Sequence, residues 1–342
     1  MRRTPGYLQC YPMIAKTLID EEFDLLTIFF PVMKLKSVYQ LQNGKIGPIS
    51  GLIKEYPILN DLSPFLSQNY VNDEPINDPI VAVSDLSPDK LLDEVEIVTF
   101  FAASSEQARG EEEILGQRHT IGLFNKDNKV FLNLDGYEVG AAIDLLQGTR
   151  FQYFPHAYFT WDDNNIDNFE DFISEVLTSN FFKALNSCFH EVQDKEMKRD
   201  RARILISIKI FNEAIIPPNV PSIHLFSKSY IILLGAAFEA LLNLPQDNIE
   251  KSFQHSVMLL AGNRSTTLKR WCKKFYNYRS RLAHGDIDWY GEEESFNIGG
   301  NKSLPYPYIG SRLFVHCLKT KLFLMGLFPE YKKDEFLLEA YL

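Results

Sequence analysis

An arginine and a histidine five residues apart, Arg279 and His284, are the residues of this sequence best suited to chemistry. Arginine stays charged at physiological pH and binds phosphate oxygens through a planar set of donors. Histidine exchanges protons near neutral pH and is the commonest general acid or base. A fixed cation and a proton carrier at this spacing predict phosphodiester chemistry on RNA.

The pair lies in a segment whose apolar residues recur with the period of an α-helix. With Leu268 at zero and 100° per residue, six apolar positions including Leu268 fall within about 80° of it. The other five are Trp271, Cys272, Phe275, Tyr278 and Leu282. Arg279 falls at about 20°, inside this stripe, whereas Lys274 and Arg281 fall on the opposite side. Burying an unpaired charge is costly, so we expect Arg279 to meet a carboxylate, a subunit interface or a bound phosphate.

A single carboxylate is the simplest structural partner for this arginine. Glu239 is the lone charge in the apolar segment Tyr230 to Leu242. An ion pair between Glu239 and Arg279 would explain the buried cation without any chemistry. The two interpretations are compatible, because a carboxylate can orient an arginine that also binds phosphate.

The end of the helix decides what His284 can do. Gly285 suits the left-handed position that follows a helix, which places His284 in the last turn, where carbonyl groups lack helical partners. The helix dipole there favours a protonated imidazole. Capping or packing is the alternative role for a histidine before glycine. On an ideal helix His284 lies about 140° from Arg279, so one chain does not focus both side chains on one atom unless the helix end unwinds.

The distribution of charge favours a polyanionic partner for the C-terminal half only. The net charge is −10, but residues 1 to 190 hold 14 Lys and Arg against 28 Asp and Glu, and residues 191 to 342 hold 21 against 17. Such asymmetry is typical of a chain that meets a polyanion with one half. We predict that RNA-backbone contacts come from Lys269, Arg270, Lys273 and Lys274. A merely solvated helix face and an acidic surface that aids solubility are the alternatives.

These features together resemble the HEPN superfamily, and within it the Apea-like HEPN domains associated with bacterial defence. The resemblance rests on the R-x4-H string from Arg279 to His284, within Tyr276 to Gly285, and on the preceding helix Ala237 to Leu242 with its embedded glutamate. It covers roughly residues 220 to 330. The N-terminal half shows no specific match.

The resemblance implies a helical domain that dimerises, so that motifs from two protomers form one metal-independent ribonuclease site. It implies that the RNA 2′-hydroxyl attacks the adjacent phosphorus, which leaves a 2′,3′-cyclic phosphate and a 5′-hydroxyl. Arg279, His284 and the polar residue Ser280 are then the expected catalytic residues. Glu239, Tyr276 and Arg281 are expected to support them. A role in anti-phage defence, abortive infection or as a toxin follows from the same resemblance, with an antitoxin or a phage-derived trigger as a further partner.

The rest of the sequence predicts an α+β protein with two domains. Turn-forming residues from Asp162 to Asn168 separate a mixed N-terminal domain, residues 1–165, from an all-α C-terminal domain, residues 166–342. The N-terminal domain would sense a trigger or select RNA. The expected helices are Phe169 to Phe189, Asp194 to Ile215, Ile223 to Asn243, Ile249 to Leu260, Ser265 to His284 and Gly310 to Gly326, with a loop from Gly285 to Pro307.

The expected elements of the N-terminal domain are shorter and less regular. Strands are expected at Ile97 to Ala102, Thr120 to Phe124, Lys129 to Leu134 and Phe151 to Trp161. Helices are expected near Pro88 to Glu94 and Gly140 to Leu146. The proline-containing stretch Gly44 to Asp89 has little periodicity and is expected to wrap the surface.

Several other classes of protein are disfavoured by composition. The four cysteines form no C-x-x-C pair, so neither a zinc site nor a disulfide framework is indicated. No cofactor or metal is expected, and Gly299 to Ser303 lacks the spaced first glycine of a phosphate-binding loop. The longest apolar segment is too short to span a bilayer, and we expect a cytoplasmic protein. A non-catalytic HEPN module that binds RNA, a nucleotide or a partner protein remains the alternative to an enzyme.

Overall fold

The computed structural model of the 342-residue chain contains two groups of elements. Contacts divide the chain into a first unit, Met1–Ala102 with Glu106–Leu177, and a second, Ala103–Ser105 with Thr178–Leu342. The described residues are 25–30, 35, 37–57, 59–60, 70–71, 74–75, 78, 80–84, 88–104, 120–124, 151–152, 175–215, 223–245, 247–286, 295–299 and 302–338. The predicted boundary after residue 165 lies outside them. The described part is mostly helical with a small antiparallel sheet, in keeping with the predicted α+β class.

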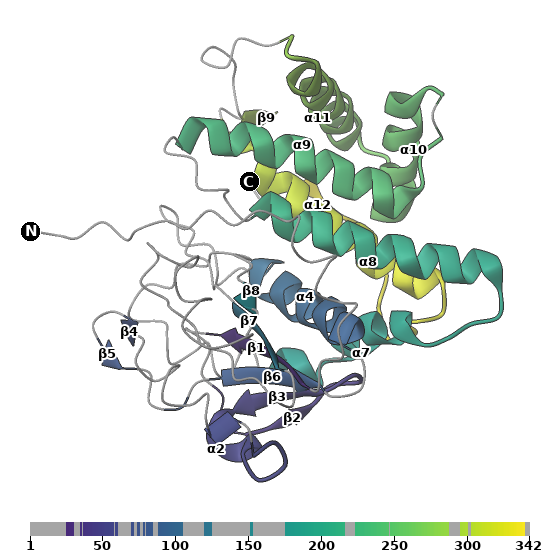
Figure 1. Cartoon of the computed structure of the whole chain (residues 1–342). Helices are drawn as coiled ribbons and strands as arrows, with labels where there is room; N and C mark the ends of the chain where they lie inside the picture. The colour runs from purple at the N-terminus through teal and green to yellow at the C-terminus, as the bar shows by residue number, and fades with distance from the viewer. Residues whose placement is uncertain are drawn as a thin grey trace, which may run out of the picture. The chain divides into compact units, whose positions relative to one another are not determined.

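An antiparallel sheet of six strands forms the centre of the first unit (Figure 1). Its strand order is β2-β3-β6-β1-β7-β8, and each neighbouring pair is antiparallel. The strands are β1 (Leu25–Phe30), β2 (Tyr39–Gln40), β3 (Lys45–Pro48), β6 (Ile80–Ser84), β7 (Thr120–Phe124) and β8 (Phe151–Gln152). β6 lies between β3 and β1 and is buried along its whole length. The other elements that the structure describes in this unit are the short helix α2 (Ile49–Leu52), the pair β4 (Tyr70–Val71) and β5 (Glu74–Pro75), and α4 (Pro88–Ser104).

Two predictions for this unit are wrong. The apolar run Ile97 to Ala102 belongs to the helix α4, not to a strand. Leu91, Glu94, Ile97 and Val98 are all buried, and their spacing marks one helical face. The stretch Gly44 to Asp89 contains β3 to β6 and α2 rather than irregular surface chain.

The other predictions for the first unit are confirmed or lie outside the described residues. The strand Thr120 to Phe124 and the helix that starts at Pro88 are confirmed. Only Phe151–Gln152 of the predicted strand at residues 151–161 is described, and it is the strand β8. The predicted elements at residues 129–134 and 140–146 lie outside the described residues.

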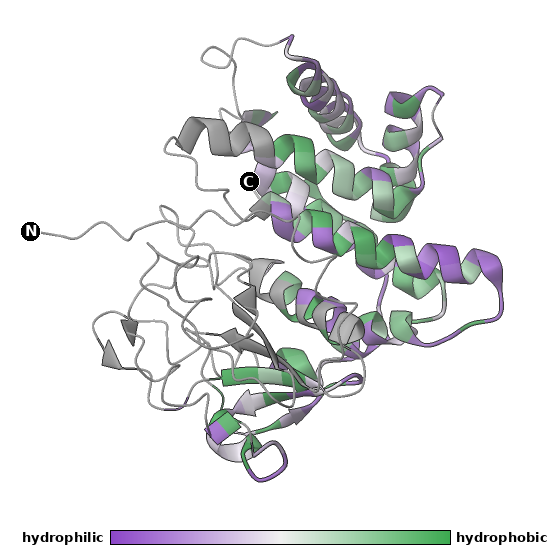
Figure 2. Ribbon diagram, viewed as in Figure 1, coloured by the Kyte–Doolittle hydropathy of each residue, from purple (hydrophilic) through white to green (hydrophobic). Residues whose placement is uncertain are grey.

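Helices form most of the second unit. They are α7 (Asn180–Asn186), the 3-10 turn η4 (Ser187–Phe189), α8 (Lys195–Ile215), α9 (Ile223–Leu242), α10 (Ile249–Ala261), α11 (Thr266–His284) and α12 (Tyr306–Leu324). α9 lies against α8, α11 and α12, and α10 lies against α11 and α12 (Figure 1). Figure 2 shows α9 as mostly hydrophobic where it is coloured and α11 as hydrophilic along one side. α9 is therefore the central helix of this unit, and α11 is an amphipathic helix at its surface.

Aromatic side chains fill the core between these helices. Trp271 and Phe275 of α11 stack with ring centres 4.7 Å apart. Phe238 of α9 meets Phe253, Phe275 and Phe314 edge to face. Such geometry stabilises contacts beyond the area that they bury. The α11 stripe that holds Arg279 is thereby fixed against α9.

The predicted helices of this unit are close to the observed ones, with two corrections. The helix expected from Phe169 to Phe189 is interrupted at Ser179, whose side chain accepts a hydrogen bond from the Phe182 backbone N–H and so begins α7. The expected loop from Gly285 to Pro307 contains an antiparallel hairpin, so the unit is not all-α. Its strands are β9 (Ser295–Gly299) and β10 (Lys302–Pro305), and α12 begins directly after it at Tyr306. None of the described helices is long and apolar enough to span a bilayer.

Candidate active site on helices α9 and α11

Arg279 lies between α11 and α9 and is paired with Glu239. Its Nη2 donates a hydrogen bond to Glu239 Oε2 at 2.9 Å. The exposed fractions of the two side chains are 19% and 28%, so the pair is reachable from solvent. The prediction that Arg279 lies in the core stripe and needs a carboxylate, an interface or a phosphate is met by this carboxylate.

Tyr276 completes the set of groups that hold Glu239. Its hydroxyl donates to Glu239 Oε1 at 2.7 Å, and the Arg279 guanidinium lies 5.7 Å from the centre of its ring. Burial raises the pKa of Tyr276, and its hydrogen bond to the carboxylate raises it further, so the hydroxyl stays a donor. Each oxygen of Glu239 therefore accepts from a different residue of α11.

A glycine on α9 provides the space in which Arg279 lies. A Cβ atom on Gly235 would lie 2.7 Å from Arg279 Cγ and 3.0 Å from its Nε. No side chain fits at residue 235 while the arginine keeps this position. Gly235 stands one turn before Glu239, and glycine within a helix is destabilising by about 1 kcal/mol relative to alanine. Such an unfavourable residue in the middle of a helix is a signal that the predictions from sequence did not use.

Part of the guanidinium remains available to a ligand. Nε is buried without a hydrogen-bond acceptor, and Nη2 binds Glu239. Nη1 donates no hydrogen bond to a described residue, and it is not among the buried polar atoms that lack a partner. A partly exposed, carboxylate-oriented guanidinium with an open nitrogen is suited to bind one phosphate oxygen.

His284 lies at the surface as the last residue of α11. Gly285 takes the left-handed conformation, φ 72° and ψ 18°, and its N–H donates to Leu282 O. The Asp286 N–H donates to Arg281 O at 2.9 Å, which closes the helix end. The prediction of a glycine-terminated helix is confirmed. The imidazole is exposed, and it makes no hydrogen bond or ion pair within the described part of the chain.

The angular separation of Arg279 and His284 around the helix is maintained. Because α11 is helical through His284, the end does not unwind to bring the two side chains together. They stay about 140° apart and about 7.5 Å apart along the axis. Ser280 is half-buried and falls between them on the helix surface. Within one chain, the arginine and the histidine therefore lie on different sides of α11 and do not meet at one atom.

The four basic residues predicted to bind an RNA backbone do not form one group. Arg270 donates to the carbonyl of Asn297 in β9 at 3.0 Å and lies over the ring of Phe296, 5.2 Å from its centre. Lys274 lies over the same ring at 5.9 Å. The hairpin was not predicted from the sequence, and it engages two of the four cations.

The remaining two cations lie on the histidine side of α11. Lys269 and Lys273 are exposed, and at 100° per residue they share a side of the helix with Ser280 and His284. Arg281 is also exposed, lies on the other side, and donates weakly to the Asp286 carbonyl at 3.5 Å. Lys273 and Lys269 therefore lie on the same side of α11 as His284, about 16 and 22 Å from it along the helix axis.

No family model, curated protein or solved structure matches the chain. Within the described ranges, no three His, Cys, Asp or Glu side chains are grouped so that they could hold a metal ion. The site is thus characterised by its own geometry. It consists of an oriented guanidinium, a neighbouring serine and an exposed imidazole.

Proposed function

We propose that the protein is a metal-independent endoribonuclease of the HEPN type. The observation that carries the proposal is the position of Arg279, a guanidinium inside an apolar helix stripe, oriented by Glu239 with one nitrogen open, five residues before an exposed helix-ending histidine. The resemblance of the R-x4-H string and the α9 segment to the HEPN superfamily supports the same assignment.

The proposed reaction uses the RNA itself as nucleophile. The 2′-hydroxyl loses its proton to a base and attacks the adjacent phosphorus, while the bond from phosphorus to the 5′-oxygen breaks and that oxygen takes up a proton. The products are a 2′,3′-cyclic phosphate and a 5′-hydroxyl. His284 exchanges the protons, which contributes about 10²- to 10⁴-fold. Arg279 binds the non-bridging oxygens as their charge grows, and DNA is not cleaved because it lacks the 2′-hydroxyl.

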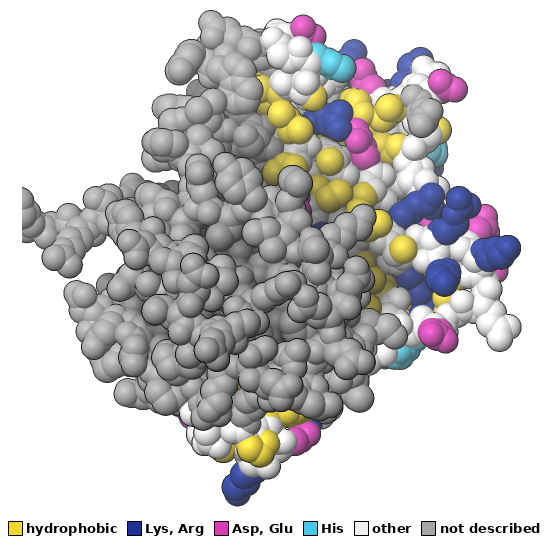
Figure 3. Space-filling model, viewed as in Figure 1, with side chains coloured by type: hydrophobic (Ala, Val, Ile, Leu, Met, Phe, Trp, Pro, Cys, Tyr) yellow, Lys and Arg dark blue, Asp and Glu magenta, His cyan; other side chains and the backbone are white. Residues whose placement is uncertain are grey.

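The separation of Arg279 and His284 favours a site shared between two copies of the chain. α9 carries Ile232, Ala236 and Ala240 in half-buried positions on the side that also bears Glu239. Figure 3 shows hydrophobic side chains around basic and acidic groups over α9 and α11. Apolar surface of this kind is typical of an interface, and a second copy would bring a second imidazole to the same phosphate.

A second candidate function is a non-catalytic HEPN module that binds RNA, a nucleotide or a partner protein. The ion pair between Arg279 and Glu239 favours it, because the same 2.9 Å contact would form in a purely structural role. Under this candidate function His284 is dispensable for the fold and contributes to no cleavage. Cleavage assays separate the two functions directly.

The biological role proposed with the enzyme is defence against phage, abortive infection or toxicity in the cytoplasm. The first unit, whose sheet is described above, would then sense a trigger or select the RNA, and an antitoxin would hold the activity off. Support for this role comes from the resemblance alone.

The deciding experiment compares the purified full-length protein with His284→Ala on single-stranded RNA in EDTA. We expect the wild type to leave 2′,3′-cyclic phosphate ends and His284→Ala to lose about 10²-fold or more of the rate. His255→Ala is the matched control, because His255 is an exposed histidine of another helix, α10, outside the motif. Gel filtration should show a dimer for all three proteins. Cleavage that persists in His284→Ala, or that His255→Ala lowers equally, would falsify the assignment.

A further inference from the structure

We infer that Gly235 is a positioning residue for Arg279: the missing side chain on α9 fixes where the guanidinium lies and therefore how fast the proposed site cleaves. This inference rests on the proposed function and deepens it. It concerns a residue that contacts neither RNA nor the reacting atoms in the proposed site.

The closest contacts at Gly235 are made by Arg279. The three atoms nearest to a Cβ placed on residue 235 are all in the arginine side chain: Cγ at 2.7 Å, Nε at 3.0 Å and Cδ at 3.2 Å. The glycine is not required by the backbone, because the described glycines with positive φ are Gly262, Gly285 and Gly326. A buried glycine in the middle of α9 thus has one visible role in this structure, which is to make room for Arg279.

A methyl group at residue 235 cannot be accommodated by bending the end of the arginine. Cγ is the second carbon of the side chain, so its position follows from the χ1 rotamer and the α11 backbone. Relief of a 2.7 Å contact requires a new rotamer or a shift between α9 and α11. Either change moves Nη2 away from Glu239, one turn further along α9, because the present geometry places them 2.9 Å apart.

The first test measures thermal stability and does not depend on activity. Gly235→Ala is expected to lower the melting temperature by about 2 to 4 °C when Arg279 is present. In the Arg279→Ala background the same substitution is expected to raise the melting temperature. The arginine side chain that contacts residue 235 is then absent, and alanine is a better helix former than glycine. This reversal of sign is specific to a contact between the two residues. Equal shifts in both backgrounds overturn the inference.

A second glycine of the same unit provides the matched control. Gly310 in α12 also lacks room for a side chain, with Leu234 Cδ2 at 2.5 Å from its Cβ position, but none of the three nearest atoms belongs to Arg279. Gly310→Ala should change the melting temperature by the same amount whether residue 279 is arginine or alanine. A reversal at Gly310 as well would show that Arg279→Ala loosens the unit generally, and this too overturns the inference.

The second test measures cleavage. Displacing a positioned catalytic group by about 1 Å can cost about 10²-fold, so Gly235→Ala should lower kcat by about 10- to 100-fold with KM within about twofold. Gly310→Ala should leave kcat per folded molecule within about twofold. A Gly235→Ala enzyme with wild-type kcat overturns the positioning role even if the stability reversal is found.

The failure of this inference is distinguishable from failure of the proposed function. If the wild type cleaves no RNA, the proposed function fails and the positioning role in cleavage fails with it. The stability reversal then still decides whether Gly235 and Arg279 are coupled. If the wild type cleaves and the two glycine variants behave alike, the function stands and the inference about Gly235 is wrong.

Discussion

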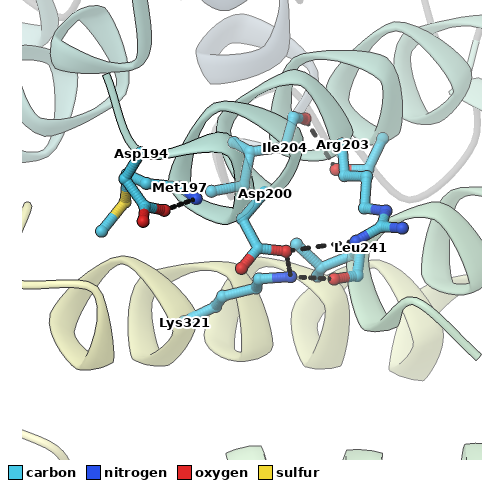
Figure 4. Close-up of polar contacts among 8 residues, drawn as sticks. Asp194, Met197, Asp200, Arg203, Ile204, Leu241 and Lys321 are labelled. Carbon is cyan, nitrogen blue, oxygen red and sulfur yellow. Dashed lines mark hydrogen bonds and ion pairs between the residues drawn. The ribbon is translucent and has the colours of Figure 1, made fainter. Parts of the chain in front are cut away.

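Two cations of the second unit lie between helices with similar exposure, but their partners differ. Arg279 binds the Glu239 carboxylate and is 19% exposed. Lys321 of α12 is 15% exposed and donates to the Leu241 carbonyl of α9 at 2.6 Å, with Asp200 of α8 at 3.7 Å (Figure 4). Both residues link α9 to a neighbouring helix, so burial alone does not distinguish them.

The difference lies in the acceptor that each cation binds. Lys321 binds a carbonyl in the last turn of α9, one of those that a helix cannot satisfy by itself. That role is structural, and burial lowers the pKa of Lys321. Arg279 binds the Glu239 carboxylate, which also accepts a hydrogen bond from the Tyr276 hydroxyl, and its Nη1 donates no hydrogen bond to any residue that the structure describes. The two cations therefore differ in their acceptors, a main-chain carbonyl for Lys321 and a side-chain carboxylate for Arg279, and three substitutions test what this difference means.

The largest effect is expected for Arg279→Lys. Lysine retains the charge but not the planar donors, so it cannot bind Glu239 and a phosphate oxygen in the same geometry. We expect kcat in EDTA to fall by about 10²- to 10³-fold. The free energy of unfolding should change by about 1 kcal/mol or less, because the substituted lysine keeps a partly exposed ion pair within reach. Cleavage at the wild-type rate would place Arg279 in the same structural class as Lys321.

Lys321→Met is expected to show the opposite pattern. The Leu241 carbonyl loses its donor, which costs about 1 to 3 kcal/mol of unfolding free energy in urea denaturation. kcat per folded molecule should stay within about twofold of the wild type. A tenfold loss of kcat in a fully folded sample of the variant would contradict the structural role of Lys321.

The same variant also removes a pH dependence. Burial lowers the pKa of Lys321 below its usual value, so the unfolded chain keeps this proton over a pH range in which the folded chain has released it. Stability rises with pH wherever the unfolded state binds more protons. The contribution of Lys321 to the free energy of unfolding should therefore increase between its lowered pKa and about pH 10.4. This increase should be absent from Lys321→Met. If the stability of Lys321→Met depends on pH in the same way as that of the wild type, Lys321 does not cause this pH dependence.

The sequence predicted where Arg279, Glu239 and His284 lie in the fold because its signals are local. The stripe of α11 follows from spacing, Gly285 from its position after the last periodic residue, and Glu239 from being a lone charge in an apolar segment. Gly235 was not predicted, because its role depends on how α9 faces α11. The hairpin that engages Arg270 was also missed, since two short strands in a polar stretch give little periodicity.

The first unit was predicted less well for a related reason. The apolar run Ile97 to Ala102 is compatible with a buried strand or a buried helix, and only the spacing back to Leu91 and Glu94 identifies α4. Glu94 is fully buried and accepts hydrogen bonds from the Gln42 and Asn43 backbone N–H groups at 2.7 and 2.9 Å. Contacts across about 50 residues leave no pattern in a single sequence. Contacts between residues that are far apart in the sequence were therefore the part of the fold that could not be predicted.

The smallest effect is expected for Tyr276→Phe, which separates orientation of the carboxylate from contact with RNA. Glu239 loses the donor on Oε1 but keeps Arg279 on Oε2, so the loss is one hydrogen bond, about 1 kcal/mol. We expect kcat to fall by about two- to fivefold with KM unchanged. Tyr331→Phe is the matched control, because its hydroxyl lies 3.4 Å from His316 Nδ1 and does not contact Glu239. A loss as large as that of Arg279→Lys would mean that Tyr276 itself touches the reacting phosphate. No loss would mean that Arg279 is oriented by Gly235 and Glu239 alone.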